Sequence, residues 1–243
     1  MRNSYYLFFI LILIASCVGE PYSTGQQHSG DLTHDYPIGQ STMDSDPSLT
    51  EIEVSNEESK RFIWQKPREV IRLLGMGGSL SDKTIADIGA GPSGYFTFEF
   101  VRYVEKVIAI DIAQSAIHYM DSIRTFHLRE NYQDKIETRL VPDDDPKLQP
   151  NEADIVFMSN VFTYIKNPTA YLQKIKEGMP VGGRICIIDY KMRKIPEGVF
   201  PPVSERIPLY KVEEELETAG FKHLDSFDDV LEFQYIVIAE KIE

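Results

Sequence analysis

The stretch Ile85-Ala-Asp-Ile-Gly-Ala-Gly-Pro-Ser-Gly94 decides the fold class of this chain. Its first residues are apolar, as in a buried strand, and its glycines suit a turn that opens a helix. A second apolar run, Val107-Ile-Ala-Ile110, follows and ends in Asp111. A strand, a glycine turn and a carboxylate about 20 residues later form the pattern that binds an adenosine-containing cofactor against a parallel sheet. We therefore predict a nucleoside site at the end of the first strand.

The residues of this pattern have separate roles in the prediction. Gly89 and Gly91 lack a Cβ, so the backbone through Ala90 can adopt angles closed to other residues and bring its amides close to a ligand. Asp111 ends the second strand and is placed to accept hydrogen bonds from a ribose diol. Ile112 follows, and two interpretations stand for it: it covers one face of the adenine, or it belongs to the core.

The glycine spacing also fits a dinucleotide fold, and Asp87 separates the two interpretations. Dinucleotide sites place a pyrophosphate at the amino end of the helix, where a nearby carboxylate would repel it. A cofactor with an ammonium and a sulfonium, and no phosphate, tolerates or uses this acid. With acid-x-Gly-x-Gly at residues 87–91, the chain resembles the class I S-adenosylmethionine-dependent methyltransferases. Asp87 is expected to hold the ammonium, directly or through water, or to cap the turn.

Two later segments resemble the same family. Segment 142–148, Pro-Asp-Asp-Asp-Pro-Lys-Leu, resembles the loop in which the family places an acid beside the adenine amino group, and Asp144 matches that acid best. Segment 153–160, Ala-Asp-Ile-Val-Phe-Met-Ser-Asn, resembles the fourth strand. The resemblance implies that Asn160, at the end of that strand, lines the site and that the cofactor is S-adenosylmethionine.

The resemblance covers roughly residues 61–241. Segment 179–184, Met-Pro-Val-Gly-Gly-Arg, resembles the turn before the fifth strand, although its second and third residues depart from the usual order. Upstream, Trp64-Gln-Lys-Pro67 resembles a subgroup of bacterial methyltransferases, several of them exported, that carry this tetrapeptide before the first core helix. Pro67 suits the first turn of a helix, and Trp64 is expected to be a core anchor rather than a cofactor lid.

Alternating strands and helices predict an α/β fold with a doubly wound, mostly parallel seven-stranded sheet, the Rossmann-like methyltransferase fold, which ends in an antiparallel hairpin. The short connection Asp228-Asp229 implies that hairpin. Helices are expected near residues 93–104, 113–129, 168–177 and 210–219. Strands are expected near residues 84–89, 106–111, 135–141, 154–159, 184–189, 221–227 and 231–239.

The amino terminus carries the second strong signal. After Arg2, residues 5–14 are almost wholly apolar but too short to span a bilayer comfortably. They lead into Ile14-Ala-Ser-Cys17, which resembles the bacterial lipobox, so residues 1–16 are predicted to be a signal peptide and Cys17 to be lipidated. The protein would then be a membrane-anchored lipoprotein of the bacterial cell envelope, on the periplasmic or outer face. A plain secretory signal, an uncleaved anchor, or a true start at Met43 are the alternatives.

Residues 17–52 are predicted to be the lipidated cysteine and a flexible linker, and residues 53–243 to be the methyltransferase domain. The linker is rich in Ser, Thr, Gly, Gln, Asp and Pro and cannot bury enough apolar surface to offset its ordering. His28 and His34 lie in it without a third ligand nearby, so no metal site is predicted. The second cysteine, Cys186, lies in an apolar strand and is expected to be a buried small hydrophobe.

The formal net charge of −13 bounds the partners. An acidic chain without a basic stripe is a poor nucleic-acid binder, because phosphate contacts supply most of that affinity. A small molecule, or a protein side chain, is the expected substrate. No nucleic acid is expected as a partner, and the membrane is expected to be contacted through the lipid anchor. The sequence leaves the oligomeric state open.

The sequence predicts a methyltransferase acting on an unidentified small molecule. Two alternatives stand beside it: an NAD(P)-binding oxidoreductase, and a lipid-anchored binding protein that keeps the fold without turnover. Methyl transfer depends mainly on positioning, so dedicated acids and bases are optional and no catalytic residue is assigned. Five residues are candidates to line the acceptor pocket by family position, each expected to be structural or surface: Tyr164, Asp189, Lys191, Arg206 and Tyr235.

Overall fold

The computed structural model of the chain describes residues 56–195 and 200–243. The expected signal peptide, Cys17 and the whole of the expected linker lie outside these residues. Within them, no helix is both long and apolar enough to cross a membrane.

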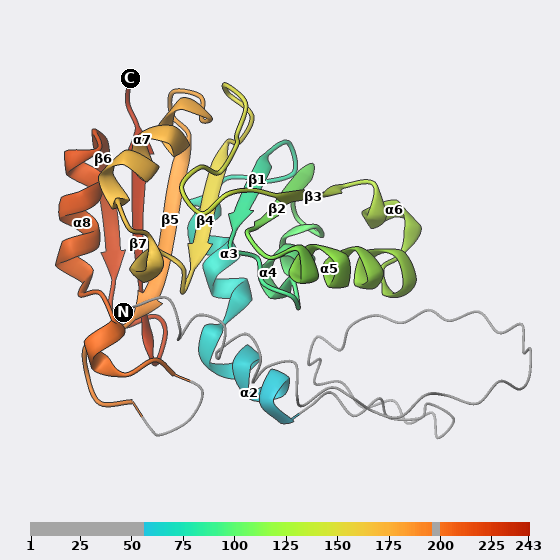
Figure 1. Cartoon of the computed structure of the whole chain (residues 1–243), viewed down its shortest axis with the longest axis horizontal. Helices are drawn as coiled ribbons and strands as arrows, with labels where there is room; N and C mark the ends of the chain where they lie inside the picture. Colours follow the sequence, from blue (N-terminus) through green and yellow to red (C-terminus); the bar gives the residue numbers. More distant parts are fainter. Residues whose placement is uncertain (1–55, 196–199) are drawn as a thin grey trace, which may run out of the picture. The chain divides into compact units, whose positions relative to one another are not determined.

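Seven strands form one sheet in the order β3-β2-β1-β4-β5-β7-β6 (Figure 1). Strands β1 to β5 run parallel to one another, and β7 is antiparallel to both β5 and β6. The predicted fold class, a mostly parallel seven-stranded sheet with a carboxyl-terminal antiparallel hairpin, is confirmed. The strands are β1 (Thr84–Ile88), β2 (Lys106–Asp111), β3 (Ile136–Leu140), β4 (Ile155–Ser159), β5 (Arg184–Tyr190), β6 (Phe221–Phe227) and β7 (Gln234–Lys241).

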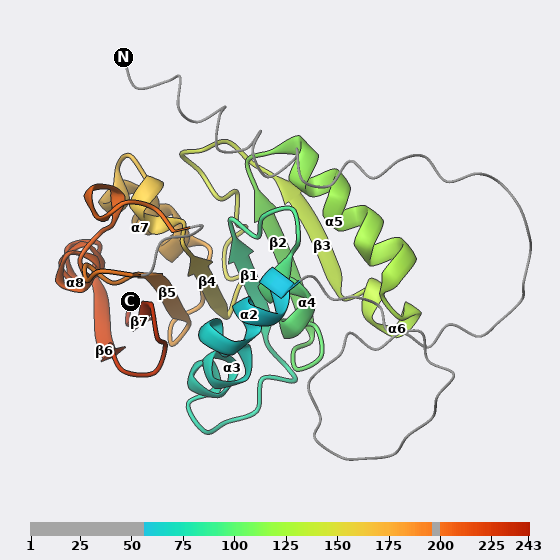
Figure 2. The same ribbon diagram turned by 90° about the horizontal axis from the view of Figure 1, so that it is seen from below.

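Helices cover both faces of the sheet because alternate strand residues point to opposite sides. On one face, Ala86 and Ile88 of β1 pack in the same apolar cluster as residues of α7 (Pro168–Glu177) and α8 (Leu209–Thr218). On the other face, Ile85 packs with residues of α3 (Pro67–Gly75), α4 (Tyr95–Phe100) and α5 (Gln114–His127). Figure 2 shows α7 and α3 on opposite sides of β4 and β5. The described helices also include α2 (Asn56–Gln65) and α6 (Glu130–Gln133), with the short 3-10 turns η1 (Phe162–Tyr164) and η2 (Val203–Glu205).

Local chemistry explains where two helices begin. Helix α7 has the predicted bounds because Asn167 caps it, with Oδ1 accepting from the Ala170 amide at 3.4 Å, and Pro168 occupies the first turn. Helix α4 is shorter than the expected 93–104. Gly94 takes a left-handed conformation with φ 54°, so helical geometry begins only at Tyr95.

The last strand begins at Gln234 rather than Leu231, so the connection within the hairpin spans residues 228–233 instead of two residues. Lys191 explains the difference. Its buried Nζ donates to the carbonyl oxygens of Asp228 and, at 2.8 Å, of Leu231. These bonds hold the connection as a loop, because the two carbonyls are directed to a side chain and not to a neighbouring strand.

The carboxyl ends of the five parallel strands meet at one edge of the sheet, the edge at which α/β proteins bind ligands. In Figure 1 the arrowheads of β1 and β4 point toward this edge and toward α2. Cys186 lies away from it, in the core of β5 and 1% exposed, and burial raises the pKa of its thiol. The prediction that Cys186 is a buried small hydrophobe is confirmed.

Candidate functional site

The glycine turn follows β1 and is fastened to β2. The amides of Gly89 and Ala90 both donate to the Ile110 carbonyl, at 2.8 and 3.1 Å. A Cβ on Gly89 would lie 2.3 Å from Cγ2 of Val161, so glycine is required for the turn to pack against the residues after β4. Gly91 has the same φ of 71°, yet a Cβ there would meet no atom within 4 Å. The turn therefore has one crowded side and one open side, and the open side exposes backbone to a ligand.

Asp111 ends β2 and holds the turn from below. Its Oδ2 accepts a hydrogen bond from the Gly91 amide at 2.9 Å, and its Oδ1 accepts one from the Ala113 amide at 2.9 Å. A carboxylate offers about four lone-pair positions, so each oxygen can still accept a second donor. The next residue, Ile112, is 56% exposed, which makes it a surface residue of this edge and not a core residue.

Asp87 lies beneath the turn and is 3% exposed. Its Oδ2 accepts a hydrogen bond of 2.6 Å from the Thr97 hydroxyl in α4. Burial raises the pKa of Asp87 to about 7, and the negative charge of Asp111 adds to the increase, while the Thr97 bond and the positive charge of Arg61 oppose it. Two carboxyl groups therefore flank the turn, and one of them changes its charge near neutral pH.

Asn160 follows β4 and has a left-handed backbone with φ 60°. Its backbone N–H donates to the Ile188 carbonyl at 2.8 Å, which fixes the backbone of Asn160 at the end of the sheet. Its side-chain Oδ1 accepts a 2.6 Å bond from Nε2 of Gln234, a residue of β7 that is 0% exposed. Gln234 is one of the site residues that the sequence analysis missed, and Thr97 is another.

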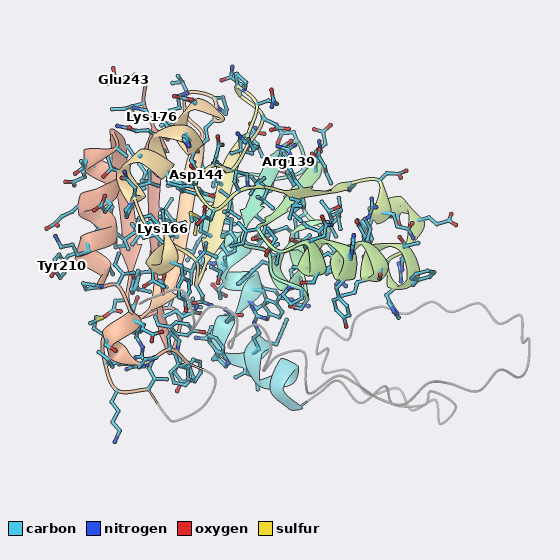
Figure 3. The ribbon with its side chains drawn as sticks, viewed as in Figure 1. Arg139, Asp144, Lys166, Lys176, Tyr210 and Glu243 are labelled. Atoms are coloured by element: carbon cyan, nitrogen blue, oxygen red, sulfur yellow. The ribbon has the colours of Figure 1, made fainter. Side chains whose placement is uncertain are left out.

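Asp144 lies on the loop between β3 and β4, where Figure 3 labels it. Its side chain is 78% exposed, and its carboxylate lies 4.0 Å from Nζ of Lys174 on α7. Lys174 also donates to the Asp144 carbonyl at 2.8 Å. Asp144 thus contacts α7. The other predicted cofactor residues in this part of the chain are joined through the turn and the strand ends: Asp87, Gly89, Ala90, Gly91, Asp111 and Asn160. The place of Asp144 beside an adenine stays a prediction.

Three of the residues considered for the acceptor pocket are bound to backbone carbonyls. Lys191 holds the hairpin loop, as described above. The Arg206 guanidinium donates to the carbonyls of Pro201, Lys191 and Arg193 at 2.8 to 3.0 Å. The Tyr235 hydroxyl donates to the Ile207 carbonyl at 2.8 Å. These three side chains shape the segment after β5 by fixing its backbone.

Asp189 lies in the buried part of β5, one residue before the end of the strand, and is 0% exposed. The Tyr190 amide donates to its Oδ1 at 2.8 Å, and the Thr163 amide donates to its Oδ2 at 3.3 Å. Burial raises the pKa of Asp189 to about 6, against the effect of these two amides. The carboxyl group therefore joins β5 to η1. Tyr164, also in η1, is 44% exposed.

An aromatic cluster lies at the carboxyl end of β5. Trp64 of α2 packs edge-on against Phe200 with ring centroids 5.4 Å apart, and Phe200 packs against Phe233 at 5.3 Å and Tyr190 at 5.4 Å. Trp64 is therefore packed among rings, but it is only partly buried and belongs to neither apolar core cluster, so its role as a core anchor stays a prediction. Among the described residues, no group of three or more His, Cys, Asp or Glu side chains is arranged to hold a metal ion.

Comparison with known proteins agrees with this geometry. A family profile described as a methyltransferase domain matches residues 79–234, more than half of the chain. No curated protein matches the sequence.

Solved structures with the same fold include a SAM-dependent methyltransferase from Aquifex aeolicus, with a TM-score of 0.66 and 23% identity, covering 75% of this chain and 93% of that one. Geranyl diphosphate C-methyltransferase from Streptomyces coelicolor A3(2), in complex with S-adenosyl-L-homocysteine, has a TM-score of 0.58, 15% identity and coverages of 82% and 88%. Phosphoethanolamine N-methyltransferase 2 from Haemonchus contortus, in complex with S-adenosyl-L-methionine, has a TM-score of 0.57, 14% identity and coverages of 74% and 53%. At these identities the likeness shows a shared fold.

Proposed function

This chain belongs to the methyltransferase-domain family, and on that basis we propose that it binds S-adenosylmethionine at the glycine turn and transfers the methyl group to a small-molecule acceptor. The observation that carries the proposal is the pair of carboxyl groups at the turn. Asp87 lies in β1 just before the turn, and Asp111 is bonded to its Gly91 amide, while the outer face at Gly91 is open. A phosphate at this turn would meet negative charge, whereas an ammonium and a sulfonium would be attracted.

Each residue of the turn has a proposed contact. Asp111 would accept from the ribose hydroxyls with its remaining lone pairs. The open backbone at Gly91 would line the ligand, while the amides of residues 89–91 stay bonded to Ile110 and Asp111. Asp87 would stabilise the ammonium. The exposed Ile112 offers an apolar surface for one face of the adenine, and this exposure favours the ligand-facing interpretation over the core one.

Asn160 and Asp144 complete the proposed cofactor site. Asn160 lies at the end of β4, next to β1 in the sheet, so it adjoins the turn on the side away from Asp111. Asp144 would meet the adenine amino group, as the family resemblance implies, and this contact requires its side chain to leave Lys174. With an exposed fraction of 78%, the Asp144 side chain is accessible for that change.

When bound, S-adenosylmethionine supplies an activated methyl group on a sulfonium. The chain contributes orientation: the turn and Asp111 fix the nucleoside end, and Asp87 and Asn160 fix the amino-acid end, which lowers the entropy cost of alignment. Asp189 is 0% exposed, so its carboxyl group is out of reach of an acceptor molecule. We therefore assign no general base, and the proposed mechanism depends on positioning. The aromatic cluster of Trp64, Tyr190, Phe200 and Phe233 offers an apolar wall for an acceptor molecule.

The cofactor assignment is tested by calorimetric titration of the purified domain with S-adenosylmethionine and, in parallel, with NAD⁺ and NADP⁺. We expect saturable binding of S-adenosylmethionine and no binding of either dinucleotide, because of the carboxyl groups at the turn. A dinucleotide that binds and raises the melting temperature, while S-adenosylmethionine does neither, would replace the proposal with the oxidoreductase alternative. Bound cofactor without methyl transfer to a broad panel of acceptors would favour a binding protein.

We further propose that the protein is a lipoprotein of the bacterial cell envelope, anchored through Cys17 and tethered by the polar segment that follows it. The support is the apolar stretch that ends in Ile14-Ala-Ser-Cys17. Mass spectrometry of the protein from its native membrane fraction should show a mature chain that begins at a lipidated Cys17. An intact Met1, or an unmodified amino terminus at another position, would contradict this assignment.

A further inference from the structure

A chain of side-chain hydrogen bonds connects α2 with the end of β4. Nε of Arg61 donates to Oε1 of Gln65 at 2.5 Å, and Nε2 of Gln65 donates to Oε1 of Gln234 at 3.3 Å. Nε2 of Gln234 then donates to Oδ1 of Asn160 at 2.6 Å. Gln65 and Gln234 are both 0% exposed. Buried amide groups are retained in a core only where they are hydrogen-bonded, and here each glutamine meets a partner on both sides.

Arg61 fixes the donor-to-acceptor direction of this series of hydrogen bonds. A guanidinium only donates hydrogen bonds, so Gln65 must turn its oxygen toward Arg61 and its nitrogen toward Gln234. Gln234 must then accept from Gln65 with its oxygen and donate with its nitrogen. Asn160 receives that donor on its oxygen. The side-chain amide of Asn160 could by itself face either way. The positive charge of Arg61 therefore fixes its orientation through the two glutamines between them.

The remaining group is Nδ2 of Asn160. Among the side chains that the structure describes, those of residues 61–195 and 200–243, none accepts a hydrogen bond from it, and Asn160 is partly exposed. Strand β4 adjoins β1 on the side opposite β2. Residue 160 thus lies beside the glycine turn, across it from Asp111, and the next residue, Val161, packs against Gly89.

We infer that Arg61, Gln65 and Gln234 are positioning residues that hold Asn160 as a hydrogen-bond donor for the carboxylate of the amino-acid part of S-adenosylmethionine. The inference rests on the proposed function. Asp111 suits the ribose, and Asp87 suits the ammonium. The carboxylate is the negatively charged group of that ligand, and it needs hydrogen-bond donors, which an ionised carboxyl group cannot supply. A donor at Asn160 supplies one at the correct end of the turn.

The substitution Gln65→Glu tests the inference because it reverses the chain of bonds without changing its shape. A carboxylate still pairs with Arg61 but cannot donate, so Gln234 must turn its nitrogen toward residue 65 and its oxygen toward Asn160. Asn160 must then donate to Gln234 and present Oδ1 to the ligand. Calorimetry with two probes reports the change: S-adenosylhomocysteine has the amino-acid carboxylate, and 5′-methylthioadenosine has the nucleoside and sulfur but no amino-acid part.

We expect Gln65→Glu to lower the affinity for S-adenosylhomocysteine about tenfold or more, which is the effect of losing a hydrogen bond to a charged group. The 5′-methylthioadenosine affinity should stay within about twofold, a difference too small for a lost hydrogen bond. Asn160→Asp, at a partly exposed position, should show the same selective loss, and the double variant should bind no more weakly than Asn160→Asp alone, because the two changes act on one contact. Gln173→Glu, at an exposed position of α7, adds the same charge and should leave both affinities unchanged.

Each other outcome counts against the inference. Equal losses for both probes in Gln65→Glu would show a general effect on the fold, and unchanged S-adenosylhomocysteine binding in Asn160→Asp would show that Asn160 does not contact the carboxylate. A wild-type protein that binds neither probe would overturn the proposed function and the inference together, whereas wild-type binding with no selective loss would overturn the inference alone.

Discussion

Asp111→Ala is expected to lower the affinity for S-adenosylmethionine about 100-fold or more. Two effects combine in this loss. The carboxylate is the proposed acceptor for the ribose hydroxyls, and hydrogen bonds to a charged group contribute about 1.5–3 kcal/mol each. The same carboxylate accepts the amides of Gly91 and Ala113, so its removal also releases the turn that lines the ligand. Calorimetry of the folded variant with S-adenosylhomocysteine and 5′-methylthioadenosine measures the loss.

Both probes contain the ribose, so Asp111→Ala should weaken them equally, unlike Gln65→Glu. Two variants serve as controls. Asp229→Ala removes a charge from an exposed position and should leave binding unchanged. Asp111→Asn keeps one carbonyl oxygen for a backbone amide, so it should recover much of the lost stability and little of the affinity. Near wild-type binding by a folded Asp111→Ala protein would show that the ribose is held elsewhere.

The arrangement of the sheet could be predicted because it depends on local patterns that repeat along the chain. The apolar strands ending at Ile88 and Asp111 and the capped helix after Asn167 are each encoded within about ten residues, the scale on which periodicity is informative. The glycine turn and Asp111 were predicted to meet for the same reason, since the carboxyl ends of parallel strands share one edge. The structure joins them through the Gly91 amide.

The remaining features depend on contacts between distant segments. Gln65 and Gln234 are separated by 169 positions, and nothing local indicates that they bond. Helix α2 was not predicted, because its first residues, Asn-Glu-Glu-Ser-Lys, are polar and its apolar residues are few. The loop at 228–233 reads as the start of a strand, yet Lys191 of another segment binds its carbonyls.

Asp87 should make the ligand-free protein less stable as the pH rises from about 4 to above 7. Its pKa is raised by burial from the ordinary 3.8 to about 7, so the folded state holds a proton that the unfolded state has released. The contribution of Asp87 to the free energy of unfolding is fully present below pH 3.8 and is lost as the pH passes 7. The loss is up to about 4 kcal/mol, at 1.36 kcal/mol per pKa unit.

Asp87→Asn removes the titration, but the new side chain can still accept the Thr97 hydroxyl. At pH 8 the variant should melt several degrees higher than the wild type, and near pH 4 the two should coincide. Asp189, whose pKa burial raises to about 6, is present in both proteins and cancels in the comparison.

The same titration should control ligand affinity in the opposite direction. The ammonium of S-adenosylmethionine favours the ionised form of Asp87, so binding releases a proton and strengthens as the pH rises through 7. Wild-type affinity should be about eightfold weaker at pH 6 than at pH 7.5, the ratio of ionised fractions for a pKa of about 7. Asp87→Asn should bind weakly at both values, and 5′-methylthioadenosine, which has no ammonium, should show no such slope with the wild type. Calorimetry in buffers of different ionisation enthalpy counts the released proton.

A wild-type affinity that does not depend on pH would show that Asp87 is not the partner of the ammonium. The stabilised Asp87→Asn protein would then keep its full affinity. Ionised Asp87 lowers the stability of the ligand-free protein, and the ammonium of the bound ligand offsets that loss. We therefore expect stability to fall and ligand affinity to rise as the pH increases through 7.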